Sequence, residues 1–189
     1  MKKGLLIVCS GPSGVGKGTV LAKVLKKNPN MQYSISITTR APRSDEVEGI
    51  SYFFKSKVEF LKMIDADEVL EYAEVFDNFY ATPKAYVLEK LQEGKDVVLE
   101  IDVQGAMQIK EKMPEAVLIF LAPPSFEELE RRLRGRASES IEVISRRLQD
   151  AHGELAQQDK YDYVIVNKTV DETVKEFMVI VEKEKEKRK

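Results

Sequence analysis

Residues 5–19 read LLIVCSGPSGVGKGT, and this stretch determines the fold class that the sequence predicts. It opens with the continuous apolar run Leu5–Cys9, which is typical of a strand buried on both faces of a parallel sheet. A glycine-rich turn follows, and its Gly11…Gly16-Lys17 spacing is that of a P-loop. Because the turn stands between a strand pattern and a helix pattern, the sequence predicts a phosphate-binding loop.

The residue types in this turn suit a nucleoside triphosphate. Glycines let successive backbone N–H groups converge on phosphate oxygens, and the positive end of the following helix points at them. Lys17 can reach the β- and γ-phosphates as a point charge, so we interpret it as catalytic. The residues predicted to bind ATP are Gly11, Pro12, Ser13, Gly14, Val15, Gly16, Lys17, Gly18 and Thr19.

One position departs from the strict P-loop pattern. Gly18 stands where a serine or threonine usually provides a hydroxyl for Mg²⁺. We still expect Mg²⁺ to accompany ATP, since this ion is often held mainly by phosphates and water. Thr19 and Glu100 are the candidate protein ligands, and the sequence leaves the ligand set open.

The remaining apolar runs predict the rest of the fold. Val97–Ile101, Ala116–Leu121 and Tyr163–Val166 are also continuous, and helical patterns lie between the four runs. Thr82 before Pro83 is interpreted as a helix cap, and Ser125 with Glu128 as a capping box. The prediction is an α/β protein with a P-loop and a doubly wound parallel sheet flanked by helices.

Two segments interrupt this alternation and suggest how the chain is organised. Residues 34–82 are rich in short strand-like pieces and predict a small inserted subdomain, and residues 125–150 predict two helices around an arginine-rich turn. We expect one domain over residues 1–189, with a core of residues 1–33, 83–124 and 151–189.

Composition and charge exclude several classes of protein. The net charge of −2 gives no overall attraction to nucleic acid or to an anionic membrane, and no apolar run approaches the length of a membrane span. The single cysteine, Cys9, cannot form an internal disulfide, which favours the cytoplasm. The single histidine, His152, is interpreted as structural. The oligomeric state is left open.

Further motifs resemble those of guanylate kinases from about residue 4 to residue 167. Ser36-Ile37-Thr38-Thr39-Arg40-Ala41-Pro42-Arg43 and Ile101-Asp102-Val103-Gln104-Gly105 are specific to that family rather than to P-loop proteins in general. The other shared motifs are Glu46 with Gly49 and Tyr52, Glu71-Tyr72-Ala73, Asn78-Phe79-Tyr80, Ala122-Pro123-Pro124-Ser125, and Arg132 with Arg136 and Arg147.

This resemblance implies an enzyme that phosphorylates GMP, and also dGMP, with ATP in purine nucleotide metabolism. It implies that Arg40, Arg43, Tyr52 and Tyr80 hold the phosphate of GMP. It further implies that Ser36, Glu71, Thr82 and Asp102 bind guanine. Residues 34–82 would then be the GMP-binding subdomain, and residues 125–150 a lid that brings the catalytic arginines Arg132, Arg136 and Arg147 to ATP.

The chemistry of guanine agrees with these assignments. Guanine donates hydrogen bonds from N1–H and from its 2-amino group, and ionised carboxylates only accept them. Glu71 and Asp102 would therefore pair with guanine and leave adenine unpaired. Two alternatives stay open: a kinase for another nucleoside monophosphate, and a non-catalytic module of guanylate-kinase type that binds phosphopeptides.

Overall fold

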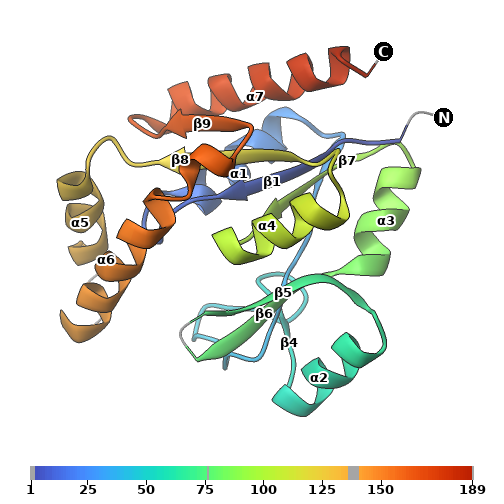
Figure 1. The fold of residues 1–189 in the computed structure, drawn as a ribbon, viewed down its shortest axis with the longest axis horizontal. Helices are drawn as coiled ribbons and strands as arrows, with labels where there is room; N and C mark the ends of the chain where they lie inside the picture. The colour runs from blue at the N-terminus through green and yellow to red at the C-terminus, as the bar shows by residue number, and fades with distance from the viewer. Residues whose placement is uncertain (1–2, 76, 136–140, 189) are drawn as a thin grey trace. The chain divides into compact units, whose positions relative to one another are not determined.

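The computed structural model describes residues 3–75, 77–135 and 141–188, and the chain divides into two compact units. Unit 1 contains Met1–Val8 and Asn30–Ala116, and unit 2 contains Cys9–Pro29 and Val117–Lys189 (Figure 1). Each unit is described separately below. In the described part of the chain, no helix combines the length and the apolar character that a membrane span requires.

A parallel sheet carries the P-loop. Strand β1 (Leu6–Ser10) leads into that loop. In unit 1, β2 (Met31–Tyr33) pairs in parallel with β7 (Asp96–Glu100), and in unit 2, β8 (Val117–Ala122) pairs in parallel with β9 (Tyr163–Val166). All residues of β1 and β8 are buried, as is β7 except for Glu100. The predicted strands are thus confirmed to within one residue at each end. Strand β2 is too short for the apolar pattern to reveal.

Strand β9 corrects one expectation, because it is not buried on both faces. Ile165 is buried, whereas Val164 and Val166 are 40% and 43% exposed. This alternation is that of a strand with one solvated face, and β9 is the last strand of its sheet. An apolar sequence run therefore did not distinguish a central strand from an edge strand.

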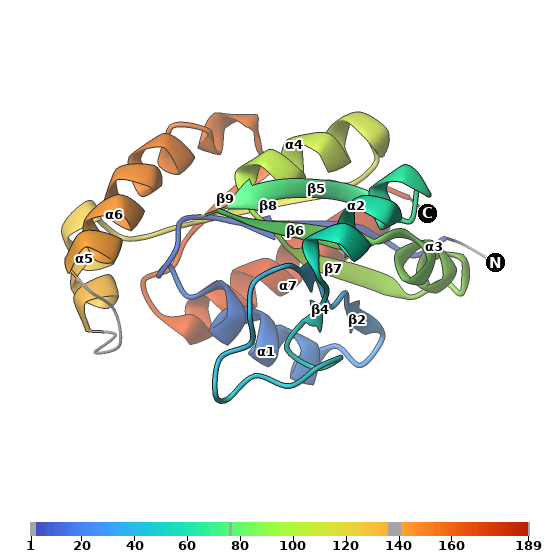
Figure 2. The ribbon, with the colours of Figure 1, turned by 90° about the horizontal axis from the view of Figure 1, so that it is seen from below.

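In unit 2, helices α1 (Lys17–Lys27) and α7 (Val170–Glu186) pack against each other (Figure 2). Helical spacing in the sequence predicts the apolar stripes of these two helices. Most of their residues are buried, and Leu25 and Met178 are half-buried; the stripes are Val20, Leu21, Val24 and Leu25 on α1, and Val174, Phe177, Met178 and Val181 on α7. Unit 2 also contains α5 (Phe126–Arg134), α6 (Ile141–Leu155) and a short 3₁₀ helix, Gln158–Lys160.

In unit 1, a second sheet has the strand order β4 (Phe53–Phe54), β3 (Ile37–Thr38), β6 (Asn78–Pro83) and β5 (Val69–Val75). Helix α2 (Lys57–Asp65) closes the small core of Ile37, Phe60, Val69 and Ala81. The strand-like pattern of residues 34–82 does not predict this helix. Its signal is a full capping box, in which Ser56 accepts from the Glu59 N–H and the Glu59 carboxylate accepts from the Ser56 N–H.

The remaining helices of unit 1, α3 (Lys84–Gln92) and α4 (Val103–Lys112), correct a further detail. Thr82 does not cap α3, because it lies in β6 and its hydroxyl donates to Glu71; Pro83 occupies the cap position instead. The end of α3 is as expected, with Gly94 at φ 78°.

In unit 2, the predicted capping box of α5 is half formed. Ser125 accepts from the Glu128 N–H, but the Glu128 carboxylate binds Arg131 and Arg132 rather than the backbone of Ser125.

Candidate functional site

The glycine-rich turn of unit 2 has the conformation of a phosphate-binding loop. Gly11, Gly14 and Gly16 all have positive φ, at 144°, 86° and 100°. A Cβ atom on Gly11 would lie 2.2 Å from the carbonyl oxygen of Leu121. Since side chains are excluded there by both strain and space, the glycines are required by the shape of the loop.

Lys17 begins α1 and reaches back across this loop. Its Nζ donates to the carbonyl oxygens of Gly11 at 2.6 Å and Pro12 at 3.3 Å, and the Val15 N–H donates to Pro12 O at 3.1 Å. The ammonium group is therefore held over the loop by the loop's own backbone. This position suits a lysine that binds phosphates.

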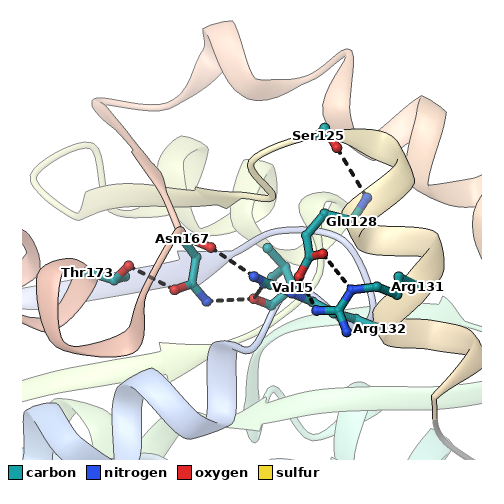
Figure 3. Close-up of polar contacts among 7 residues, drawn as sticks. All are labelled: Val15, Ser125, Glu128, Arg131, Arg132, Asn167 and Thr173. Carbon is teal, nitrogen blue, oxygen red and sulfur yellow. Dashed lines mark hydrogen bonds and ion pairs between the residues drawn. The ribbon is translucent and has the colours of Figure 1, made fainter.

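The carbonyl of Val15 is fixed by side chains that are distant in sequence (Figure 3). Asn167 Nδ2 donates to Val15 O at 2.7 Å, and Arg132 Nη1 donates to the same oxygen at 3.2 Å. Thr173 Oγ1 donates to Asn167 Oδ1 at 2.9 Å. Because Asn167 is only 3% exposed, this network is a rigid support beneath the loop.

The arginines of the helical segment contact the loop in two places. Arg132 Nη2 donates to Asn167 O at 3.2 Å and its Nε to Glu128 at 2.8 Å, while Arg147 Nη1 donates to Ser13 Oγ at 3.0 Å. Arg131 and Arg132 hold the pKa of Glu128 at about 2, so the carboxylate stays ionised. The third predicted arginine, Arg136, lies outside the described residues.

The candidate metal ligands are placed as follows. Thr19 is exposed on the first turn of α1, and Glu100 ends β7, where it accepts a hydrogen bond from Tyr33 at 3.2 Å. Within residues 3–75, 77–135 and 141–188, no three His, Cys, Asp or Glu side chains gather to form a metal-binding group. The identity of the metal ligands stays a prediction.

In unit 1, three of the four residues predicted to hold the GMP phosphate lie together. One of them is Arg40, which begins residues 40–46, and we call these residues the arginine turn. The guanidinium of Arg40 lies 5.4 Å from the centre of the Tyr52 ring, and the rings of Tyr52 and Tyr80 meet edge to face at 6.1 Å. Burial raises the pKa of Tyr52, so its hydroxyl stays protonated and able to donate. The side chain of Arg43 is exposed on the same turn.

Glu46 organises this arginine turn. Its carboxylate accepts from Arg40 Nη2 at 2.7 and 2.9 Å and from the Arg43 N–H at 2.8 Å. Arg40 also donates to Ala41 O at 2.8 Å. In the sequence, Glu46 belongs to a family motif, and its role becomes visible only in the fold. The three-residue spacing from Arg43 is the local signal for it.

A buried carboxylate dominates the predicted base site in unit 1. Glu71 is 2% exposed and accepts a hydrogen bond from Thr82 Oγ1 at 2.7 Å. Burial, helped by the nearby charge of Asp102, raises the pKa of Glu71 to about 7. Asp102 caps α4 by accepting from the Gly105 N–H at 2.8 Å. Ser36 is half-buried, and its carbonyl accepts from the Phe53 N–H at 2.9 Å.

Comparison with known proteins gives one consistent result. The family model described as guanylate kinase matches residues 3–184. The guanylate kinase of Caldanaerobacter subterraneus subsp. tengcongensis is 52% identical over 184 residues, which are 97% of this chain and 89% of that protein. The guanylate kinase of Clostridioides difficile is 51% identical over 187 residues, 99% of this chain and 91% of that protein.

A solved structure agrees with these sequence matches. The crystal structure of guanylate kinase from Anaplasma phagocytophilum superimposes with a TM-score of 0.82 at 38% identity, covering 97% of this chain and 87% of that one. Guanylate kinase is also the family that the motifs of residues 36–43 and 101–105 resemble. The chain belongs to the guanylate kinase family.

Proposed function

We propose that this protein transfers the γ-phosphate of ATP, bound as its magnesium complex, to GMP, and so produces ADP and GDP. The observation that carries the proposal is that the carboxylate of Glu71 is buried, in a chain that also has a P-loop with Lys17 held over its backbone. A carboxylate that only accepts hydrogen bonds selects a base that donates them, as guanine does at N1–H and at its 2-amino group.

The donor nucleotide is assigned to the P-loop. The backbone N–H groups of residues 11–19 would bind its phosphates, and Lys17 would neutralise charge on the β- and γ-phosphates. Mg²⁺ would be held largely by phosphate oxygens and water, because Gly18 has no hydroxyl. Arg132, Arg136 and Arg147 are assigned to the charge that develops on the transferred group.

The acceptor nucleotide is assigned to the arginine turn and the base site. Arg40, Arg43, Tyr52 and Tyr80 would hold the phosphate of GMP, and forked guanidinium groups suit a phosphate dianion. Ser36, Glu71, Thr82 and Asp102 would bind guanine. None of these groups contacts a ribose 2′-hydroxyl in the assignment, so dGMP is proposed as a second substrate.

The reaction needs no general base. A nucleoside monophosphate is already anionic at neutral pH, and catalysis then depends on alignment and on neutralising charge. The histidine of α6 agrees with this view, because the His152 ring stacks on Phe126 with a centroid distance of 3.9 Å. That contact supports a structural role for His152.

The organisation expected from the sequence is retained as part of this proposal. Residues 34–82 would form the GMP-binding subdomain, residues 125–150 the lid, and the remainder the core of a single catalytic domain. We place the activity in the cytoplasm and in purine nucleotide metabolism. The partners proposed are the two nucleotides, with neither nucleic acid nor a membrane.

A coupled assay of ADP release tests the proposal directly. GMP, AMP, CMP and UMP are supplied at equal concentration with MgATP, and dGMP is compared with GMP. We expect GMP to give the highest rate by a wide margin. A higher rate with AMP or a pyrimidine nucleotide would identify a different monophosphate kinase, and the lack of turnover with any of them would favour the non-catalytic phosphopeptide-binding module.

A further inference from the structure

Helix α4 runs alongside β5, the edge strand of the second sheet in unit 1 (Figure 2). Three of its side chains bind carbonyl oxygens of that strand. Gln104 Nε2 donates to Glu74 O at 3.5 Å, Gln108 Nε2 to Tyr72 O at 2.7 Å, and Lys112 Nζ to Leu70 O at 2.7 Å. Gln108 also accepts from the Tyr72 N–H at 3.3 Å. We call these contacts the α4–β5 ladder.

The regularity of the ladder follows from the geometry of the two elements. The helix contributes every fourth residue, which corresponds to a rise of about 6 Å. The strand contributes every second residue, which corresponds to about 6.7 Å. Carbonyls of alternate strand residues point to the same edge, so a helix with polar residues at this spacing can bind a free edge in one register.

That register determines the position of Glu71, which is the residue between two of the carbonyls in the ladder. Glu71 stands between Leu70 and Tyr72, and the pairing of β5 with β6 is irregular at the same place. Val69 pairs with Pro83 and Tyr72 with Ala81, so Leu70 and Glu71 both oppose the single residue Thr82. Such a bulge redirects side chains, and here it accompanies the bond from Thr82 to Glu71.

Gly105 completes the arrangement from the helix side. A Cβ atom at this position would lie 2.3 Å from Glu71 Oε2 and 3.3 Å from Asp102 Oδ1. Gly105 also donates its N–H to Asp102. The missing side chain therefore leaves room for the Glu71 carboxylate next to the helix N-terminus.

We propose that Gly105 and the α4–β5 ladder are specificity-determining positioning elements, which hold the Glu71 carboxylate where it meets the 2-amino group of guanine. The proposal rests on the function proposed above. The ladder sets the position of β5 along α4, and Gly105 sets how closely the carboxylate approaches the helix. Neither is assigned a contact with the nucleotide.

The test compares GMP with IMP, which keeps N1–H and O6 but lacks the 2-amino group. In Gly105→Ala, the new methyl group must displace the carboxylate. We expect the ratio of kcat/KM for GMP to kcat/KM for IMP to fall about tenfold, with KM for ATP unchanged. Gly153→Ala is the matched control, since Gly153 also lies in a helix and a Cβ there meets nothing within 4 Å. It should leave the ratio unchanged.

A second variant covers the case in which Gly105→Ala fails to fold. Gln108→Leu keeps a similar volume and removes both bonds to Tyr72, and we expect the ratio to fall by a smaller factor. Isothermal titration with GMP alone should show weaker binding in step with that fall. A folded variant of either kind with the wild-type ratio would overturn the proposal. Wild-type protein that does not phosphorylate GMP would instead overturn the proposed function.

Discussion

The P-loop and the base site achieve precise geometry in different ways. The P-loop is shaped mainly by its own backbone, because three glycines with positive φ and the lysine at its end determine where its groups point, while Asn167 and Arg132 support it at Val15 O. The base site depends on side chains from separate elements: Glu71 on β5, Thr82 on β6 and Asp102 before α4. A site formed by the backbone can be predicted from a short sequence motif, whereas the geometry of a site formed by side chains depends on the residues that surround it.

The largest effect is expected from Lys17, the charged side chain that the P-loop holds over its own backbone. Lys17→Met removes the charge that we assign to the β- and γ-phosphates of ATP, and we expect kcat to fall by roughly 10²–10³-fold. Steady-state kinetics with saturating GMP and ATP measures this. Lys26→Met is the matched control, because Lys26 lies exposed in the last turn of the same helix and should retain kcat. Equal losses in the two variants would contradict the role of Lys17.

The support beneath the P-loop is tested by Asn167→Ala. This change removes a buried donor to Val15 O and leaves Thr173 without its partner on Asn167, so the free energy of unfolding should fall by about 1–3 kcal/mol. The KM for ATP should rise, because the loop loses its anchor. Chemical denaturation gives the first quantity and kinetics the second. Asn30→Ala changes an exposed asparagine and should stay within about 0.5 kcal/mol of wild type.

The base site should respond to pH near neutrality through Glu71. The pKa of Glu71 is raised to about 7, so below that pH the carboxyl group gains a proton and loses acceptor capacity. We expect kcat/KM for GMP to fall up to tenfold per unit as pH drops below 7. The second ionisation of GMP also contributes near pH 6, but it affects Glu71→Gln equally. The ratio of kcat/KM for GMP in the wild type to that in Glu71→Gln should therefore follow the titration of Glu71. A ratio that does not change with pH would contradict this expectation.

The same raised pKa has a defined consequence for folding. The pKa of the Glu71 carboxyl group is 4.5 in the unfolded chain and about 7 in the folded protein, so between these pH values the native state binds the proton more tightly than the unfolded state. The contribution of Glu71 to stability is thus complete below pH 4.5 and is lost as pH rises to 7. Denaturation curves should give a lower free energy of unfolding at pH 8 than at pH 5 in the wild type, and a smaller difference in Glu71→Gln.

The smallest effect is expected in the arginine turn, where the side chain of Glu46 holds both a guanidinium group and a backbone N–H. Glu46→Gln keeps the shape of the side chain but weakens its hold on Arg40 and on the Arg43 N–H. Because the pair is partly exposed, we expect KM for GMP to rise by about two- to fivefold with kcat little changed. Asp45→Asn, on the neighbouring exposed residue, is the control. Tighter GMP binding by Glu46→Gln would show that Glu46 competes with phosphate instead.

The parts of the structure that the sequence predicted are those encoded locally. The strand before the P-loop, the loop itself and the buried stripes of α1 and α7 each depend on a few consecutive residues, and all are confirmed. The strand β9 was mispredicted on burial because an apolar run does not reveal which faces of a strand are covered. Helix α2 was missed although its capping box is also local, so this omission could have been avoided.

The residues that could not be predicted are those whose role depends on distant partners. Asn167 is unremarkable in the sequence, and only the fold brings its amide to Val15. The sequence allows Thr82 to be a helix cap or a base ligand, and the structure excludes the cap because Thr82 lies in β6 and donates its hydroxyl to Glu71.

The α4–β5 ladder has a consequence for solubility as well. An uncovered edge strand is a template on which another polypeptide can add a strand, and so it favours aggregation. Gln104, Gln108 and Lys112 already bind the outward carbonyls of β5, and Gln108 also accepts the outward N–H of Tyr72. Helix α4 thus also protects the protein from self-association along this strand.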